Sequence, residues 1–354
     1  VPLECHPHHV AESTMLNEPA THSEQANLAD READEAASAG PQRASKPKPT
    51  IRHRILRTTG LLAIIYVGVC VGLVVMETRL LFPGAYMEKS ILMDPNRFEP
   101  DRPTPGTVET ITYAAVDGSD LEGRLLIRHG AEDVVLFLHG NGIHADEMDG
   151  WTRRLSDSWN ATVLTAEYRG FQSDGFTPTE TSTIEDAVSA IDTLSETTNT
   201  PISKIMVYGR SLGGGVACGL IAALHERGDS VEALCLDRTF DSAASVGADR
   251  FFFLPVRWLM KNQYDSVQAL ANFDGALLQI HGTPDHIVPR KNGRALYDSL
   301  ALEHRDWIEL PNMFHNDRLP TKTLDVAGQK LKALRDEAFP KAETGASETS
   351  PAAE

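Results

Sequence analysis

The most pronounced pattern along the chain is an apolar segment that follows a cationic one. No charged side chain occurs from Thr58 to Met76. A helix over this stretch is about 28 Å long at 1.5 Å per residue, close to the ~30 Å hydrocarbon core of a bilayer. A cleaved signal peptide is the alternative, but a long region precedes the segment and no small-x-small cleavage site comes before Glu77. We therefore predict a transmembrane helix, acting as a signal anchor, over residues 58–80.

The charges on the two sides of this segment differ. Only cationic residues precede it closely, namely Arg43, Lys46, Lys48, Arg52, Arg54 and Arg57. Both signs occur after it, in Glu77, Arg79, Glu88 and Lys89. Because positive charge is retained on the cytoplasmic side, we predict a cytoplasmic N-terminus and a C-terminal domain on the far side of the membrane.

Short apolar runs alternate with amphipathic stretches from about Thr107 to Ala338. The runs predict eight strands, at residues 109–116, 121–128, 134–138, 162–167, 204–208, 231–237, 276–280 and 306–310. Three helices are predicted at residues 211–226, 291–302 and 321–338. A fourth begins at a capping box, Ser182 to Glu185, and places Ile184, Val188, Ile191 and Leu194 on one face. Two early strands followed by strand–helix repeats predict an α/β fold with a mostly parallel sheet and helices on both faces.

Composition changes this picture in two places. Residues 1–50 and 341–354 are rich in Ala, Glu, Ser and Pro without an apolar period, so we predict disordered tails there. A formal charge of −17 argues against a nucleic-acid partner. The four cysteines have no metal-ligand or disulfide spacing, and we predict neither metal nor cofactor.

A glycine-framed serine carries the strongest chemical signal. A strand-like run leads into Gly209-Arg210-Ser211-Leu212-Gly213, and a helical run follows. This is the G-x-S-x-G nucleophile elbow in its strand–turn–helix context. The turn is so tight that Gly209 and Gly213 must lack side chains, and it holds the Ser211 hydroxyl toward a cleft. We predict that Ser211 is a catalytic nucleophile.

A serine nucleophile needs a base, and the base needs an orienting acid. Asp285 and His315 each follow one of two consecutive predicted strands, at the sheet edge where open α/β sheets hold their sites. We predict that His315 is the base and Asp285 the acid. Asp237, which also ends a strand, is the alternative acid. His281 and His286 come too early in the chain to be the base.

Two N–H donors are needed for the oxyanion, and the predicted donors are Leu212 and Asn141. Asn141 belongs to the loop after the strand at 134–138, where small neighbours let the backbone approach a substrate carbonyl. We therefore assign His139, Gly140 and Gly142 to substrate binding.

The segment between the strands at 231–237 and 276–280 contains an apolar cluster at residues 251–260 and is too short for a separate cap domain. This cluster either packs onto the sheet or forms an acyl pocket or a bilayer-facing lip. On the second interpretation, Phe252 and Trp258 bind substrate.

At these residues the chain resembles the α/β-hydrolase superfamily, and in particular the single-pass, membrane-anchored α/β-hydrolase-domain-containing serine hydrolases. The matching runs are LHGNG at 138–142, EYRGF at 167–171, GRSLGG at 209–214, DRTFDS at 237–242, GTPDHIVP at 282–289 and FHND at 314–317. The resemblance covers about residues 81–338 and implies a triad of Ser211, Asp285 and His315. Gln172 departs from the pattern, which usually has a second glycine there.

The resemblance implies cleavage of esters or thioesters, including acyl groups on lipids or proteins. We predict a membrane-anchored serine hydrolase with a hydrolase domain over residues 81–340 and a short lid. Its partners would be an ester or thioester substrate, such as a lipid or acylated protein, and the membrane. A serine peptidase of the same fold and a membrane-tethered, non-catalytic binding protein are the alternatives. Oligomeric state stays open.

Overall fold

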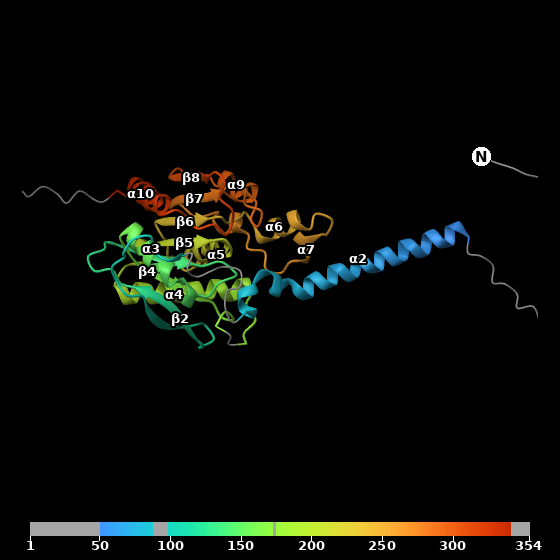
Figure 1. The fold of residues 1–354 in the computed structure, drawn as a ribbon, viewed down its shortest axis with the longest axis horizontal. Coiled ribbons are helices and arrows are strands. Elements are labelled where there is room, and N and C mark those ends of the chain that lie inside the picture. Colours follow the sequence, from blue (N-terminus) through green and yellow to red (C-terminus); the bar gives the residue numbers. More distant parts are fainter. Residues whose placement is uncertain (1–49, 88–97, 173–174, 341–354) are drawn as a thin grey trace, which may run out of the picture. The chain divides into compact units, whose positions relative to one another are not determined.

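The computed structural model describes residues 50–87, 98–172 and 175–340, and it divides the chain into two parts, residues 1–63 and 64–354. The two tails predicted to be disordered lie outside the described residues, apart from Thr50. Helix α2, Ile51–Leu81, contains the predicted span (Figure 1). Among the described residues it is the one helix that is long and apolar enough to cross a membrane, by length and composition, and no residue of its most apolar window is buried.

An eight-stranded sheet forms the centre of the domain, as predicted. Its strands are β1 Glu109–Ala114, β2 Asp120–Leu126, β3 Asp133–Leu138, β4 Ala161–Ala166, β5 Ile205–Arg210, β6 Ala233–Asp237, β7 Ala276–Gly282 and β8 Arg305–Leu310. They follow the order β1-β2-β4-β3-β5-β6-β7-β8. The pairs β1–β2 and β2–β4 are antiparallel and all other pairs are parallel. The carboxyl ends of β3 to β8 therefore meet at one edge.

Helices cover both faces of this sheet, because its central strands are apolar on both sides (Figure 1). Helices α4 (Glu180–Thr198) and α5 (Leu212–Glu226) pack together over one face, and α3 (Asp149–Trp159) and α10 (Thr321–Ala338) over the other. Each layer has its own core, one around Leu136, Val207 and Leu220 and the other around Phe137 and Trp151. Burying each such side chain stabilises the fold by roughly 1.5–3 kcal/mol.

The capping box at the start of α4 is not the predicted one. Thr179 is the N-cap: its hydroxyl accepts from the Ser182 amide at 3.1 Å, and the Ser182 hydroxyl accepts from the Thr179 amide at 2.9 Å. Glu185, the predicted partner, instead pairs with Arg169 at 2.7 Å. The buried Arg169 pairs with this carboxylate instead, and the N-cap lies three residues earlier than the predicted Ser182.

A short lid lies between β6 and β7. It consists of α6 (Ala243–Arg250), α7 (Val256–Leu259) and α8 (Ser266–Ala269), and α9 (Arg290–Ser299) follows β7. Helix α7 has only four residues. Its N-cap is Pro255, whose carbonyl accepts hydrogen bonds from the amides of Trp258 and Leu259. The lid thus folds around a few turns rather than as a separate domain.

Candidate active site

Ser211 occupies the sharp turn between β5 and α5. Its backbone has φ 53° and ψ −121°, a conformation that residues other than glycine rarely adopt. The neighbouring strand holds it there: the Ser211 amide donates to the Asp237 carbonyl at 2.9 Å, and the Thr239 hydroxyl donates to the Ser211 carbonyl at 2.9 Å. Such strain at a functional site persists because the surrounding structure over-determines it.

Glycines make this turn possible, as the sequence predicted. A Cβ on Gly213 would lie 2.1 Å from the Leu138 carbonyl oxygen, and one on Gly209 would lie 2.5 Å from the Gly213 oxygen. Both contacts are with backbone, which cannot move aside as a flexible side chain can. The elbow therefore brings α5, β5 and the loop after β3 into direct contact.

The structure brings Ser211, His315 and Asp285 together, from three separate loops at the carboxyl edge of the sheet. The distance from His315 Nε2 to Ser211 Oγ is 2.9 Å, and His315 Nδ1 lies 2.7 Å from Asp285 Oδ2. The second oxygen of Asp285 accepts from the amides of Ile287 and Val288 at 3.0 and 2.9 Å. The carboxylate is thereby locked in orientation, which fixes the imidazole through Nδ1.

Burial sets the protonation of the imidazole. It lowers the pKa of His315 below the usual value, and the charges of Arg210 and Arg238 act in the same direction against the opposing influence of Asp285. His315 is therefore neutral at neutral pH and can accept a proton at Nε2. This is the state in which a histidine serves as a general base.

Arg238 is a site residue that the sequence analysis missed. Its guanidinium donates to the carbonyls of His315 at 2.8 Å, Asp317 at 2.7 Å and Phe314 at 3.3 Å, so it fastens the loop that carries the base. Its backbone φ is 51°, a second left-handed residue beside the site. In the sequence Arg238 stands in the run DRTFDS at 237–242, which carries the resemblance but assigns this residue no role.

Asp237, the alternative acid, is committed to Arg238. Two hydrogen bonds of 2.7 and 2.8 Å join the pair, and Tyr208 donates to the same carboxylate at 3.2 Å. Burial alone would raise the pKa of Asp237, but the charges of Arg238 and Arg210 outweigh it and hold this pKa below the usual range. Asp285, rather than Asp237, contacts the imidazole.

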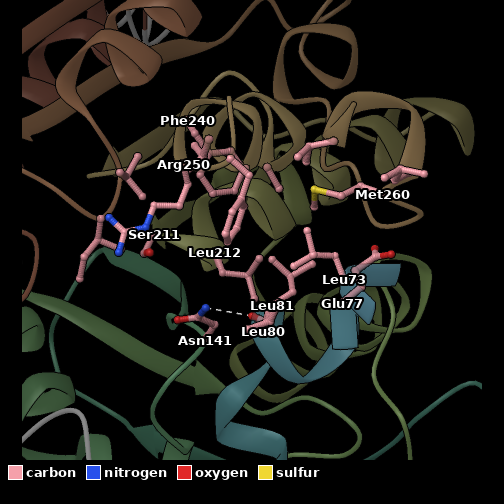
Figure 2. Close-up of a pocket in the computed structure, with 18 of the residues that line it drawn as sticks. Leu73, Glu77, Leu80, Leu81, Asn141, Ser211, Leu212, Phe240, Arg250 and Met260 are labelled. Atoms are coloured by element: carbon pink, nitrogen blue, oxygen red, sulfur yellow. Dashed lines mark hydrogen bonds between the residues drawn. The ribbon is translucent and has the colours of Figure 1, made fainter. Parts of the chain in front are cut away.

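The loop after β3 reaches Ser211 as predicted. A Cβ on Gly140 would lie 3.5 Å from the Ser211 Cβ, and Asn141 and Leu212 line one cavity with Ser211 (Figure 2). The Asn141 side-chain amide donates to the Leu81 carbonyl at 2.9 Å, and the Asn141 carbonyl accepts from the Gly84 amide at 2.9 Å. The last turn of α2 and the segment after it therefore hold this loop.

His139 does not contact the cavity, contrary to its assignment to substrate binding. It is fully buried, with Nε2 at 3.0 Å from Glu167 and Nδ1 at 2.8 Å from the Gly140 carbonyl. Glu167 also accepts from the Ala145 amide at 2.8 Å. His139 and Glu167 thus brace the loop from behind. Gly140 and Gly142 do not line the cavity either.

The cavity beside Ser211 has a volume of about 520 Å³ and a largely apolar wall. One side consists of α2 residues such as Leu73 and Leu80, and another of lid residues such as Arg250 and Met260 (Figure 2). A volume of this size is typical of small-molecule sites. The α2 side of the wall was not predicted, because hydropathy identifies only a span.

Phe252 and Trp258 also lie outside the cavity, contrary to their assignment to substrate binding. They are 85% and 89% exposed, while Val256 and Leu259 of the same segment line the cavity. Helical periodicity explains the exposure of Trp258, because Val256 and Leu259 are three apart and share a face of α7 that Trp258 does not; Phe252 lies in the turn before α7. The apolar cluster is therefore divided between a cavity wall and an exposed surface.

Glu77 is a further residue that sequence reasoning missed. It is 8% exposed, and its carboxylate accepts from the amides of Lys261 at 3.0 Å and Asn262 at 2.8 Å, and from the Asn262 side chain at 2.8 Å. These bonds tie the last turns of α2 to the lid. Nothing in its local sequence distinguishes Glu77 from an ordinary charged end of a span.

No protein-family model matches the chain. Among curated proteins, it is 28% identical to the uncharacterized protein YfhR of Escherichia coli K12 over 65% of this chain and 81% of that protein. It is 28% identical to the α/β-hydrolase domain-containing protein WAV2 of Arabidopsis thaliana, over 50% of this chain and 61% of that protein. It is 27% identical to the lysophosphatidylserine lipase ABHD12 of Bos taurus, over 60% of this chain and 56% of that protein.

Solved structures resemble the domain at low identity. An α/β hydrolase from Vibrio vulnificus matches with a TM-score of 0.53 at 19% identity, over 64% of this chain and 81% of that one. The Pyrococcus furiosus esterase PF2001 matches with a TM-score of 0.50 at 17% identity, over 66% of this chain and 97% of that one. The chain therefore has the α/β-hydrolase fold.

Proposed function

We propose that this protein is a membrane-anchored serine hydrolase that cleaves carboxylic esters or thioesters with an acyl chain. The observation that carries the proposal is the unbroken contact from Ser211 through His315 to Asp285, at 2.9 and 2.7 Å, beside an apolar cavity. A serine in a strained turn, a neutral imidazole and a locked carboxylate are the parts that acyl transfer requires.

In the proposed reaction, His315 Nε2 takes the proton of Ser211 as its oxygen attacks the acyl carbon. The amides of Asn141 and Leu212 donate to the oxyanion that forms. The imidazolium then returns the proton to the leaving alcohol or thiol, which leaves an acyl group on Ser211. Water, deprotonated by His315, attacks this ester; the acid is released as the imidazolium returns its proton to the Ser211 oxygen. Asp285 stabilises the imidazolium in both halves.

The apolar wall supports an acyl chain as the part of the substrate that the cavity holds. The wall includes the uncharged, apolar side chains of Leu73, Leu80, Val256 and Leu259. Each CH₂ of an acyl chain that is buried against such a wall contributes about 0.8 kcal/mol to binding. The similarity to a lysophosphatidylserine lipase, though only 27%, points to the same class of ester.

Membrane anchoring is part of the proposal and rests on α2. Its uncharged stretch matches a hydrocarbon core in length, and the cations before it favour a cytoplasmic N-terminus, with catalysis on the far side. Protease added to intact vesicles of known orientation tests this topology. Digestion of the C-terminal domain from the cytoplasmic face would refute it.

A chain-length series tests the proposed reaction. We expect the full-length protein in vesicles to hydrolyse p-nitrophenyl esters and acyl thioesters with a kcat/KM that rises with chain length, and the Ser211→Ala variant to be inactive. Turnover that does not depend on Ser211 would refute the hydrolase. A profile that is flat or limited to short chains would refute the acyl-chain assignment alone.

A further inference from the structure

Three exposed aromatic side chains form a surface on the lid, which we name the aromatic lip: Phe252, Phe253 and Trp258. They are 85%, 57% and 89% exposed. The Phe252 and Phe253 rings pack edge to face with centroids 5.5 Å apart, so they form a common surface. Exposed groups of large apolar side chains are rare on soluble proteins and mark interaction sites.

The lip lies beside α2 rather than beyond its end. The Tyr66 hydroxyl donates to the Phe253 carbonyl at 3.2 Å. Tyr66 comes ten residues before Met76, the last residue of the uncharged stretch, which places it about 15 Å along the helix from that end. If this stretch spans the bilayer, the lip is at the depth of the hydrocarbon core and not in the water above it.

The backbone of the lip suits such an environment, because polar groups facing lipid must be satisfied within the protein. The Phe251 amide donates to the Gly247 carbonyl at 2.9 Å, and the Leu254 amide to the Phe251 carbonyl at 2.9 Å. The Phe253 carbonyl is the acceptor of the Tyr66 hydroxyl. Two amides of this turn thus have backbone acceptors, and one of its carbonyls accepts from α2.

The charged residues near the lip are mostly cationic. Arg257 and Lys261 are exposed on either side of Trp258, and Arg250 is exposed where it lines the cavity. Long cationic side chains can bury their stems and extend their heads to lipid phosphates. Two acids are also near: Glu77 is buried against the lid, and the exposed Asp249 pairs with Lys291 at 2.6 Å.

The cavity continues from this surface toward Ser211. Leu73 and Val74 of α2 and Val256 and Leu259 of α7 line it together, so its outer wall is built from the segments that would lie in the membrane. Figure 2 shows Leu73 and Glu77 of α2 on one side of the cavity and Met260 of the lid opposite. A chain leaving the leaflet between α2 and α7 would reach Ser211 without crossing water.

We propose that the aromatic lip inserts into the same leaflet as the second half of α2, and that acyl chains enter the cavity sideways from the hydrocarbon. The proposal rests on the proposed membrane anchor and acyl substrate, and it assigns the lip a lipid bilayer as its partner. The lip is a membrane-contacting surface and not part of the acyl cavity itself.

Depth-dependent quenching tests this inference. In full-length protein with Cys5→Ala and Cys70→Ala, Phe252→Cys is labelled with an environment-sensitive fluorophore; Cys218 and Cys235 are buried and do not compete. The protein is placed in phosphatidylcholine–phosphatidylglycerol vesicles that carry a nitroxide on the acyl chain. Val116→Cys, 69% exposed in the turn after β1, is the matched control.

We expect the label at residue 252 to lose more than half of its fluorescence to the acyl-chain nitroxide, and the label at residue 116 to be quenched only by an aqueous quencher. Aqueous quenching of both labels would overturn the inference. Protection of residue 252 from both quenchers would also overturn it, since the lip would then contact protein. Trp258→Cys repeats the test if Phe252→Cys does not fold.

Fluorophosphonate labelling of Ser211 in the same vesicles separates this inference from the proposed function. A labelled Ser211 with a water-exposed lip would refute lip insertion and leave the hydrolase intact. An unlabelled Ser211 with a lipid-quenched lip would refute the hydrolase and leave lip insertion intact.

Discussion

Glu77→Ala is the substitution that most directly tests whether α2 is a structural part of the hydrolase domain. Loss of the carboxylate leaves three donors without their acceptor: the amides of Lys261 and Asn262 and the Asn262 side chain. An unsatisfied buried donor costs about 1–3 kcal/mol. Because Glu77 is 8% exposed and water can reach the site in part, we expect a loss near the low end, about 3 kcal/mol in total.

Thermal unfolding of the full-length protein in lipid nanodiscs measures this loss. For a domain of this size, 1 kcal/mol shifts Tm by roughly 2–4 °C, so Glu77→Ala should lower Tm by about 6–12 °C. Glu77→Gln keeps an acceptor oxygen and removes the charge, and it should cost about 1 kcal/mol.

Glu226→Ala is the control, since Glu226 is exposed at the end of α5 and substitutions at such sites change stability by about 0.5 kcal/mol or less. The order of destabilisation should be Glu77→Ala, Glu77→Gln, Glu226→Ala. A Tm for Glu77→Ala equal to that of Glu226→Ala would refute the reasoning, because α2 would then be only a tether.

Three further predictions concern the site. Gly213→Ala should abolish folded protein, because its Cβ would meet the Leu138 carbonyl at 2.1 Å, whereas Gly60→Ala, which has open space around it, should keep wild-type yield; equal yields would contradict the elbow geometry. Asp285→Asn should lower kcat by about 10⁴-fold without loss of folding, since the imidazole loses its orienting charge, and a kcat within tenfold of wild type would contradict its role. Because burial lowers the pKa of His315, kcat/KM should fall with decreasing pH around a midpoint below the usual histidine value of about 6.5; a midpoint above that value would contradict the neutral base.

The architecture was predictable because its signals are local. The central strands β3 to β7 are short, largely apolar runs, whereas β1, β2 and β8 mix apolar and charged residues, and each strand was predicted within a few residues of its observed bounds. The meeting of Ser211, Asp285 and His315 was also predictable, because parallel strands end at a common edge. Gly209 and Gly213 indicated the elbow because the turn leaves no room for a side chain at either position, and in the structure a Cβ at either glycine would clash with backbone atoms.

The lining of the cavity was not predictable, because it depends on contacts that no local pattern encodes. Phe251 and Phe252 are adjacent in an apolar run, yet one lines the cavity and the other faces outward. His139 directly follows β3, at the sheet edge where ligand-binding residues are expected. Its imidazole instead contacts the carboxylate of Glu167, which directly follows β4. Glu77 looks like the charged end of a span and contacts residues more than 180 positions away.

The pairing of Arg238 with the His315 loop illustrates the same limit. Arg238 follows a strand beside an acid, and its sequence context suggests a surface ion pair. In the fold it is almost fully buried, and it donates to three carbonyls around His315. The parallel order β6-β7-β8 brings these segments to the same edge of the sheet.

The central claim is that Ser211 is an activated nucleophile, and covalent labelling tests it most directly. Folded full-length protein in vesicles is treated with a fluorophosphonate, digested, and mapped by mass spectrometry. We expect one phosphonyl group per chain, on the peptide that contains Ser211, and none in Ser211→Ala. Folded protein that stays unlabelled, or that carries the group on another serine, would contradict it.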